Sequence, residues 1–437
     1  METISCQYLQ RAIYFAPDEL RHCCKRFFVQ GALRGDVRIC SVAPGEELSP
    51  ARVIREKQAM IDRINAGVQT DCTGCPFLEK RQWSAVAEER FDTLSIEHHS
   101  KCNMRCQYCS DTYHGDKSAN YDLIAFLRRL VAEERIAGDL RVAWGGGEPT
   151  LLENFSELLD CVADELKPKG QRFFSNAINF SEPIARLLET DRAELVTSVD
   201  AGSVETFRKV RGVNQYRKVL THLKRYFDRA PRNVLIKYIL TEDNHSIAEI
   251  TGFVRDIQHE GLAGASFLVS TNFKEEDVSP ERGLAILYLR HLLTQAGAHT
   301  CTFDDHICFR TGQMAARLVE VNVDADTPPA VLQFIQSYAE RQGEDLQDVV
   351  IWGTGEYAEF LLENAPSLRK YRVRYFVDSD PKKQNREFHG APVYPPQAIT
   401  QDDASILIAS GLFYKEIVDT ILGLGVGRER ILSNILI

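Results

Sequence analysis

The sequence of 437 residues lacks a long hydrophobic run, an excess of basic residues and any internal repeat. It contains no stretch of about 20 consecutive apolar residues, the length that a membrane-spanning helix needs. The formal net charge of −10 argues against nucleic acid as the substrate, because contacts to phosphate groups need a basic surface. The first residues lack the basic and then apolar pattern of a secretory signal. We therefore expect a cytoplasmic protein that binds neither membranes nor nucleic acid.

Cysteine, in contrast, is plentiful, with twelve residues. In a reducing compartment such thiols are expected to bind metal rather than to form disulfides. Three of them, Cys102, Cys106 and Cys109, lie within eight residues as Cys-x-x-x-Cys-x-Tyr-Cys. Three thiolates can bind three irons of a four-iron cluster and leave the fourth iron open to a ligand. The alternative is a structural zinc site, although zinc usually takes four ligands that include CxxC pairs.

A glycine-rich segment follows the next predicted strand, which covers residues 140–144. It reads Gly145-Gly146-Gly147-Glu148-Pro149. Glycines let the backbone approach a ligand closely, and the Glu148 carboxylate can accept a hydrogen bond from an ammonium group. The alternative is an ordinary glycine-rich turn.

The cysteine run followed by Gly-Gly-Glu-Pro resembles the radical S-adenosylmethionine (SAM) superfamily. The resemblance implies a [4Fe–4S] cluster on Cys102, Cys106 and Cys109, with SAM bound to the open iron. It also implies reductive cleavage of SAM to a 5′-deoxyadenosyl radical. The further SAM contacts that it implies are Tyr108, Gly146, Gly147, Glu148, Asn176, Ser198, Asp200 and Lys237, with Arg208 or Arg211 able to pair with a carboxylate. The alternative for each polar residue among them is a hydrogen-bonded cap at a strand end.

The order of the predicted elements indicates an α/β protein. Strands and helices alternate between residues 91 and 272, which is typical of parallel βαβ units. Six strands, at 93–97, 140–145, 172–174, 195–200, 234–239 and 266–269, fit the partial (β/α)6 barrel that the resemblance implies. We predict four parts: a cysteine-rich module at 1–90, the barrel at 91–300, a helical linker at 301–345 and a Rossmann-like domain at 346–437.

The cysteine-rich module begins with a predicted hairpin that pairs residues 27–29 with residues 36–39. Its pattern Cys24-x10-Gly35-x4-Cys40 resembles the SPASM or twitch modules of the same superfamily. Cys72 and Cys75 would complete the ligands of a second, auxiliary [4Fe–4S] cluster that transfers electrons, since four protein ligands leave no open iron. Cys23 is a nearly equivalent alternative to Cys24. A zinc site and unliganded thiols are the other interpretations.

Two cysteines follow the barrel, Cys301 and Cys308. A thiol near the barrel mouth, for which we select Cys308, could donate a hydrogen atom to a substrate radical. The alternative is a small buried residue.

The C-terminal part carries Gly353-x-Gly355-x-x-Ala358 after a predicted strand, which is the context of a dinucleotide-binding loop. Asp378 ends the next strand and could hold a ribose hydroxyl. The segment resembles Rossmann-like domains of enzymes that modify sugar nucleotides and polysaccharides, and this resemblance implies a bound nucleotide. The alternative is a docking or dimerisation domain.

We therefore favour a radical SAM enzyme that takes hydrogen from a sugar, a nucleotide-sugar or another small molecule, with dehydrogenation, epimerisation or dehydration as the outcome. A flavodoxin or ferredoxin would be the electron donor. The alternatives are a peptide-modifying maturase of the same superfamily and a non-catalytic protein of iron–sulfur binding or assembly.

Overall fold

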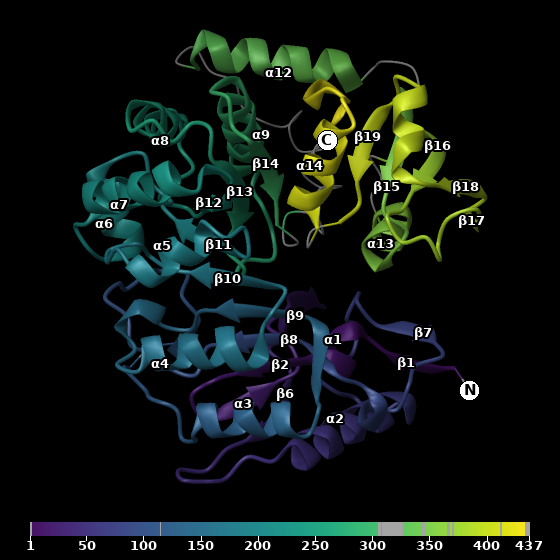
Figure 1. Ribbon diagram of the computed structural model, residues 1–437. Helices are drawn as coiled ribbons and strands as arrows, with labels where there is room; N and C mark the ends of the chain where they lie inside the picture. The colour runs from purple at the N-terminus through teal and green to yellow at the C-terminus, as the bar shows by residue number, and fades with distance from the viewer. Residues whose placement is uncertain are drawn as a thin grey trace. The chain divides into compact units, whose positions relative to one another are not determined.

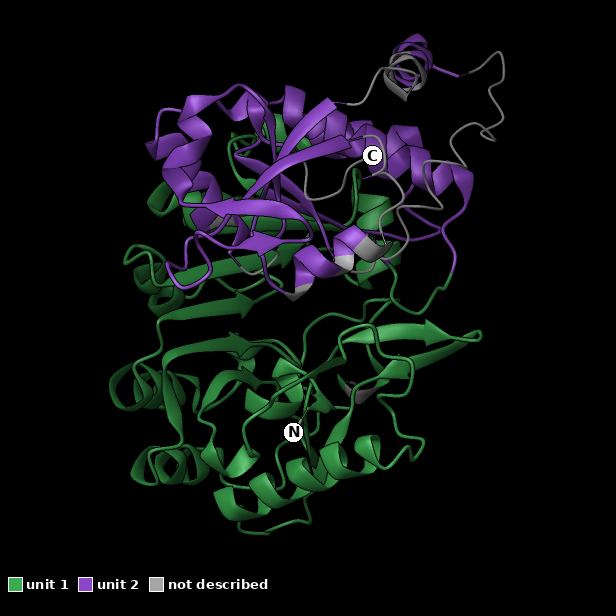
Figure 2. Ribbon diagram, turned by 90° about the vertical axis from the view of Figure 1, so that its right-hand side faces the viewer, with its two compact units in different colours: residues 1–238, 255–266, 272–276 green, residues 239–254, 267–271, 277–437 purple. Residues whose placement is uncertain are grey.

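The computed structural model describes residues 2–113, 115–304, 307, 327–342, 347–364, 368, 371–410 and 413–432. The chain forms two compact units, which Figure 2 shows in different colours. The first consists of residues 1–238, 255–266 and 272–276, and the second of residues 239–254, 267–271 and 277–437. The cysteine-rich segment 1–90 and most of the expected barrel strands thus belong to one unit.

The first unit alternates strands and helices along the chain (Figure 1). Its strands are β1 (Thr3–Ser5), β2 (Ala12–Phe15), β3 (Glu19–Arg21), β4 (Arg26–Val29), β5 (Ala32–Gly35), β6 (Arg38–Ser41), β7 (Glu79–Arg81), β8 (Phe91–Ile96), β9 (Ile136–Trp144), β10 (Gly170–Phe174), β11 (Ala193–Ser198) and β12 (Val234–Leu240), whose last two residues are counted with the second unit. Its helices are α1 (Gln7–Arg11), α2 (Pro50–Asn65), α3 (Leu123–Ala132), α4 (Phe155–Asp160), the π-helix η4 (Cys161–Leu166), α5 (Glu182–Leu188), α6 (Val204–Arg211) and α7 (Tyr216–Arg229).

The main sheet of this unit has the order β12-β11-β10-β9-β8-β2-β3-β6. All pairs from β12 to β2 are parallel, and β3 and β6 continue the sheet antiparallel. Helices connect the successive strands from β8 to β12. The described strands form an open sheet, so the expected α/β class with a partial barrel is confirmed. The last expected strand is β13 (Ser266–Thr271), most of which belongs to the second unit.

Apolar residues of the parallel strands form the core. Leu94, Phe173 and Leu195 are fully buried, and Trp144 stacks on Phe173 with ring centroids 5.5 Å apart. Parallel strands covered by helices bury both faces, which is why these strands are apolar along most of their length.

Local signals set the helix ends and the turns. Ser49 and Ser203 accept hydrogen bonds from the backbone of the first turns of α2 and α6, as N-cap residues do. The expected hairpin forms differently. Gln30 and Gly31 both have positive φ angles, of 52° and 77°, so a two-residue turn joins β4 to β5. Residues 38–41 pair with β3 instead, and the predicted pairing of residues 27–29 with 36–39 is therefore wrong.

The second unit contains α8 (Ile247–His259), whose last residues are counted with the first unit, α9 (Pro280–Gln295), β14 (Thr300–Phe303), α12 (Pro329–Gln342), β15 (Gln347–Trp352), α13 (Glu356–Asn364), β16 (Tyr371–Val377), β17 (Glu387–Phe388), β18 (Ala391–Tyr394), β19 (Ser405–Ile408) and α14 (Tyr414–Gly423). A five-stranded sheet has the order β17-β18-β16-β15-β19 and is parallel except for β17. Val350 and Trp352 pack in one buried cluster with residues of α14, whereas Val349 and Ile351 pack in another with residues of α13. Side-chain alternation along β15 therefore gives this sheet two covered faces.

None of the helices within the described residues is long and apolar enough to cross a membrane.

Candidate functional site

The three clustered cysteines lie in the loop that follows β8, at the carboxyl end of the parallel strands. The backbone N–H of Arg105 donates to the carbonyl of Arg211 (3.1 Å), and that of Gln107 donates to the carbonyl of Val210 (3.0 Å). Gly212 ends α6 with φ +76°, and a Cβ atom there would lie 2.7 Å from the Arg105 carbonyl oxygen. The loop is therefore held against the end of α6, and a side chain at position 212 would push it away.

Cys102, Cys106 and Cys109 are half-buried free thiols that are close enough for their charges to act on one another. Burial raises the pKa of all three thiols, that of Cys109 to about 11, and the Arg211 guanidinium lowers the pKa of Cys102 and Cys106. Among the residues that the structure describes, no three His, Cys, Asp or Glu side chains are arranged to hold a single metal ion. Three thiols on one loop match three irons of a [4Fe–4S] cluster, whereas a structural zinc ion takes four ligands.

The glycine-rich segment is hydrogen-bonded back to this cysteine loop. The N–H of Gly147 donates to the carbonyl of His99 (2.9 Å), and the N–H of Glu148 donates to the carbonyl of Lys101 (2.7 Å). A Cβ atom on Gly147 would lie 2.1 Å from the Lys101 oxygen, and Gly146 has φ +84°. Only glycine allows the two segments to approach this closely.

Glu148 is 1% exposed, and its carboxylate has partners on the next strand's loop. Oε1 accepts from Ser175 Oγ (2.8 Å) and from the Oγ1 (2.8 Å) and N–H (3.2 Å) of Thr150, while Oε2 accepts from the N–H of Asn176 (2.7 Å). Burial raises the Glu148 pKa, and these hydrogen bonds lower it. A carboxylate oxygen has two lone-pair sites, so Oε2 can accept one further donor.

Asn176 connects Glu148 to the cysteine loop. Its side-chain Nδ2 donates to Asn103 Oδ1 (2.6 Å) and lies 3.8 Å from the Cys102 sulfur. The structure thus brings together Cys102, Glu148 and Asn176, which lie up to 74 residues apart in the sequence.

Tyr108, Asp200 and Arg211 form a buried hydrogen-bonded group. The Tyr108 hydroxyl donates to Asp200 Oδ2, and Arg211 Nη1 donates to the Tyr108 oxygen and to Asp200 (3.1 Å). Asp200 is completely buried and has φ +59°. The expected direct SAM contacts of Tyr108 and Asp200 stay predictions, and both side chains are engaged here. Ser198 and Lys237 are half-buried register partners on β11 and β12, and their roles stay predictions as well.

Two buried histidines and a glutamate that the sequence motifs did not indicate lie next to this loop. Burial lowers the pKa of His98 to about 3 and of His99 to about 4, and the Nδ1 atoms of both have no hydrogen-bond partner among the described residues. Glu97 accepts from Ser95 Oγ (2.6 Å) and from the Tyr113 hydroxyl. A signal was available, because Glu97-His98-His99 directly precedes the cysteine loop at the end of β8.

The structure gives the expected auxiliary-cluster ligands different surroundings, and their joint role stays a prediction. Cys72 and Cys75 share a buried cluster with Cys6 and Cys23. Cys24 has Glu97 as its main charged neighbour, and Cys40 lies in β6 near Arg52 and Glu56. Of the two adjacent cysteines, Cys23 and not Cys24 accompanies Cys72 and Cys75.

The two cysteines expected after the barrel are Cys301 and Cys308. Cys301 lies in β14, where burial raises its pKa to about 12. Cys308, the hypothetical hydrogen-atom donor, lies outside the described residues.

The glycine loop after β15 is hydrogen-bonded to Asp378, the acidic residue that follows β16. Gly353 has φ +113°, and a Cβ atom there would lie 2.8 Å from the Ala409 oxygen. Thr354 donates from its N–H (3.0 Å) and its hydroxyl (2.6 Å) to Asp378 Oδ2. A Cβ atom on Gly355 would lie 4.0 Å from Lys383 Nζ, with no nearer neighbour in the part of the chain that the structure describes. Asp378 therefore fastens the loop, and the predicted ribose contact would have to share this carboxylate.

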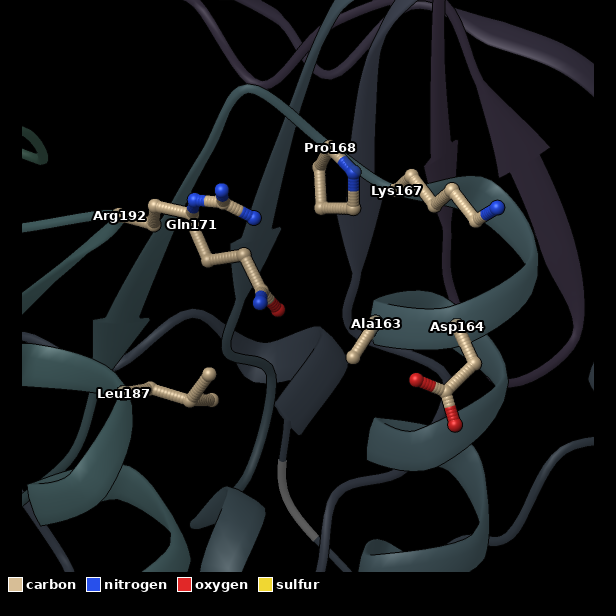
Figure 3. Close-up of a pocket in the computed structure, with 7 residues that line it drawn as sticks. All are labelled: Ala163, Asp164, Lys167, Pro168, Gln171, Leu187 and Arg192. Atoms are coloured by element: carbon tan, nitrogen blue, oxygen red, sulfur yellow. The ribbon is translucent and has the colours of Figure 1, made fainter. Parts of the chain in front are cut away.

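A surface pocket lies at the amino ends of β10 and β11 (Figure 3). The residues that line it are Ala163, Asp164, Lys167, Pro168, Gln171, Leu187 and Arg192. The cysteine loop follows the carboxyl end of the parallel strand β8, whereas this pocket lies at the amino ends of the strands. The pocket is therefore not part of the site.

Two family models match the chain. The one described as the radical SAM superfamily matches residues 96–254, and the one described as C2185-like, N-terminal, matches residues 345–432. The first therefore covers the cysteine loop, the glycine-rich segment and the strands up to β12.

Curated relatives match less than half of the chain. GTP 3′,8-cyclase of Vibrio vulnificus (strain YJ016) is 26% identical over 186 residues, which are 42% of this chain and 55% of the relative. GTP 3′,8-cyclase of Pasteurella multocida (strain Pm70) is 22% identical over 158 residues, or 36% of this chain and 47% of the relative. The chain thus spans about half the length of the curated relatives it matches.

Solved structures show a weaker similarity. Streptococcus suis SuiB bound to precursor peptide SuiA aligns with a TM-score of 0.41 at 15% identity, over 72% of this chain and 75% of that chain. Native anSMEcpe with bound AdoMet and Cp18Cys peptide aligns with a TM-score of 0.38 at 18% identity, over 48% and 62%.

Proposed function

Residues 96–254 form a radical SAM domain, and we propose that this chain uses it to cleave SAM reductively and to take hydrogen from a small-molecule substrate. The observation that carries the proposal is the joining of the cysteine loop to Gly147, Glu148 and Asn176 through the backbone and side-chain hydrogen bonds described above.

Cys102, Cys106 and Cys109 would hold a [4Fe–4S] cluster through one iron each. When bound, the cluster and SAM supply the electron and the adenosyl group for hydrogen abstraction, which the side chains of a protein cannot supply themselves. Arg211 places a positive charge beside Cys102 and Cys106, and this charge favours the thiolate forms that bind iron.

Gly146 and Gly147 hold their backbone against the cysteine segment, since Cβ atoms there would lie 2.8 Å from the His99 oxygen and 2.1 Å from the Lys101 oxygen. This backbone next to the cluster would contact the methionyl part of SAM. Glu148 Oε2 would accept a hydrogen bond from the SAM ammonium group with its remaining lone pair. Because Glu148 is buried and fixed by Ser175, Thr150 and Asn176, its carboxylate is positioned before the ligand arrives.

For the substrate we propose a sugar or a nucleotide-sugar, and for the loop at Gly353 and Gly355 in the second unit we propose a bound nucleotide. Two observations support this class. The loop after β15 has the Gly353-x-Gly355 pattern of a dinucleotide-binding loop, and the curated relatives are named for a reaction of GTP, a nucleotide. A flavodoxin or ferredoxin would supply the electron, and an auxiliary cluster would assist it.

The test is the formation of 5′-deoxyadenosine by anaerobically purified protein with dithionite and SAM. We expect product from the wild type and from Cys161→Ala, which removes a buried thiol in η4, and none from Cys102→Ala/Cys106→Ala/Cys109→Ala. A wild-type protein with a full complement of iron that forms no 5′-deoxyadenosine would instead be a non-catalytic iron–sulfur protein.

The substrate class has its own test. A nucleotide-sugar deuterated on its sugar carbons should transfer deuterium to 5′-deoxyadenosine, and the unlabelled compound should speed up SAM cleavage. Stimulation by peptides and not by any nucleotide-sugar would contradict the substrate class and leave the SAM chemistry intact.

A further inference from the structure

Four cysteines gather at the N-terminal end of the first unit, and we call them the N-terminal tetrad: Cys6, Cys23, Cys72 and Cys75. Cys6 and Cys72 are buried, at 6% and 4% exposure. Cys23 and Cys75 are half-buried and pack against the same cluster of apolar residues, which includes Leu9, Val37, Ile61 and Val86. The tetrad residues come from three separate segments of the chain.

Strand pairing and a tight turn bring these segments together. β1 pairs antiparallel with β7, with Ser5 opposite Glu79, so Cys6 lies beside the segment that follows the Cys72–Cys75 turn (Figure 1). The turn itself is closed by a hydrogen bond from the N–H of Cys75 to the carbonyl of Cys72 (3.0 Å). Gly74 has φ +79°, and a Cβ atom there would lie 2.9 Å from a methyl group of Val29.

Backbone amides point at the sulfur atoms of the tetrad. Cys6 Sγ accepts from the N–H of Leu9 at 3.5 Å. Cys23 accepts from the amides of Lys25 and Val37, and Cys75 accepts from the amide of Phe77. N–H groups directed at sulfur stabilise thiolates and are among the contacts that tune iron–sulfur clusters. An inert buried thiol needs no such donors.

Two lysines place positive charge beside the tetrad. The Lys57 ammonium group is fully buried and donates to the carbonyls of Tyr8 (3.2 Å) and Ala12 (2.8 Å). It lies near enough to Cys6 and Cys23 for their charges to act on it. Lys25 lies over the rings of Tyr8 and Phe77, 5.6 Å and 5.1 Å from their centroids, and its charge acts on Cys23 and Cys75. Burial lowers the pKa of Lys57, and negative charge on Cys6 and Cys23 raises it, so thiolates bound to metal would favour its charged ammonium form.

Four cysteines can hold either one zinc ion or a four-iron cluster. The N–H groups directed at Cys6, Cys23 and Cys75 are of the kind that set the potential of an iron–sulfur cluster, and we therefore take the cluster as the occupant.

We propose that Cys6, Cys23, Cys72 and Cys75 hold a second [4Fe–4S] cluster. Four protein ligands leave no iron open for SAM, so this cluster can transfer electrons but cannot cleave SAM. The set differs from the one that the sequence pattern indicated, because it takes Cys6 and Cys23 in place of Cys24 and Cys40.

Iron and sulfide content of full-length protein, purified without oxygen and reconstituted, tests this ligand set. We expect about eight irons per chain in the wild type and about four in Cys72→Ser/Cys75→Ser. Cys6→Ser/Cys23→Ser should lose the same cluster. The matched control is Cys24→Ser/Cys40→Ser, which should retain about eight irons. A loss of about four irons in this control together with full retention in Cys6→Ser/Cys23→Ser would overturn the assignment.

Variants of the tetrad can fail to fold, so a second variant leaves the tetrad untouched. Cys102→Ala/Cys106→Ala/Cys109→Ala should keep about four irons and should show the electron paramagnetic resonance signal of a reduced [4Fe–4S] cluster. Loss of all iron from this variant, or one zinc per wild-type chain with about four irons, would overturn the second cluster.

The same measurements separate this inference from the proposed function. A wild-type protein that forms 5′-deoxyadenosine with a single cluster, lost with Cys102, Cys106 and Cys109, would keep the function and reject the tetrad site. A protein with two clusters that does not cleave SAM would keep the tetrad site and reject the proposed function.

Discussion

The hydroxyl of Tyr108 donates a hydrogen bond to the buried carboxylate of Asp200, and it fastens the cysteine loop to the residue beyond β11. Arg211, from the end of α6, completes the group at 3.1 Å from Asp200. Asp200 has a positive φ angle of 59°, and a residue other than glycine keeps such a backbone conformation only where its surroundings hold it. Three elements therefore fix the position of Cys106 and Cys109 on either side of Tyr108.

Replacement of Tyr108 by phenylalanine should destabilise the protein without removing iron. The variant leaves a buried acceptor on Asp200 short of one donor, which costs about 1–3 kcal/mol of unfolding free energy. Urea unfolding under anaerobic conditions measures this change, with Tyr394→Phe as the control because that ring is 40% exposed. A Tyr108→Phe protein as stable as the wild type would mean that this hydrogen bond contributes nothing net.

Removal of the Arg211 charge should lower the free energy of unfolding more than Tyr108→Phe does. Arg211→Met leaves the Asp200 carboxylate buried without its cation, and breaking a buried ion pair from one side costs about 3–5 kcal/mol. In Arg211→Met/Asp200→Asn the unpaired charge is gone, so part of the stability should return. The comparison is Arg186→Met, whose side chain is 75% exposed and pairs at 3.4 Å with Glu182, itself 49% exposed, and which should cost less than about 1 kcal/mol. A double variant less stable than Arg211→Met would contradict the ion-pair explanation.

Substitution by alanine should have opposite effects on SAM binding at two nearby glycines, Gly145 and Gly147. A Cβ atom on Gly147 would lie 2.1 Å from the Lys101 carbonyl oxygen, whereas one on Gly145 would have its nearest neighbour at an ordinary 3.7 Å. Gly147→Ala should therefore displace the cysteine loop and abolish SAM binding in equilibrium dialysis, and Gly145→Ala should bind SAM within a few-fold of the wild type. Equal affinities for the two variants would show that the loop can yield without loss of function.

Local patterns in the sequence predicted the cysteine loop and the parallel strands because their signals are short. Cys102, Cys106 and Cys109 lie within one turn-forming segment, and Glu148 follows its own strand directly. The neighbours of Cys6 depend on the pairing of β1 with β7, which joins residues more than 70 positions apart. Such long-range pairing leaves no local spacing to recognise, so the sequence favoured the regular pattern from Cys24 to Cys40.

Turn geometry and side-chain partners were the other features that the sequence could not predict. The positive φ angles of Gln30 and Gly31 fix the β4–β5 register, and a Gln-Gly pair is a weak turn signal beside Asn-Gly or Asp-Gly. Asp378 matched the position of a ribose ligand, but the sequence could not reveal that Thr354 would bond to it. A motif gives the position of a carboxylate and not the donors that surround it.

Acid should destabilise the protein through His98 and His99. Burial holds their pKa values at about 3 and about 4, whereas an unfolded histidine has a pKa near about 6.5. As the pH falls below about 6.5, the unfolded chain binds protons at these two residues while the folded protein does not. Each histidine therefore lowers the free energy of unfolding by about 1.4 kcal/mol at pH 5.5 relative to pH 8. Urea unfolding at both pH values should show a smaller loss for His98→Gln/His99→Gln than for the wild type, and an unchanged loss for His259→Gln, whose side chain is 81% exposed. A double variant that loses as much stability as the wild type would place the acid sensitivity elsewhere in the protein.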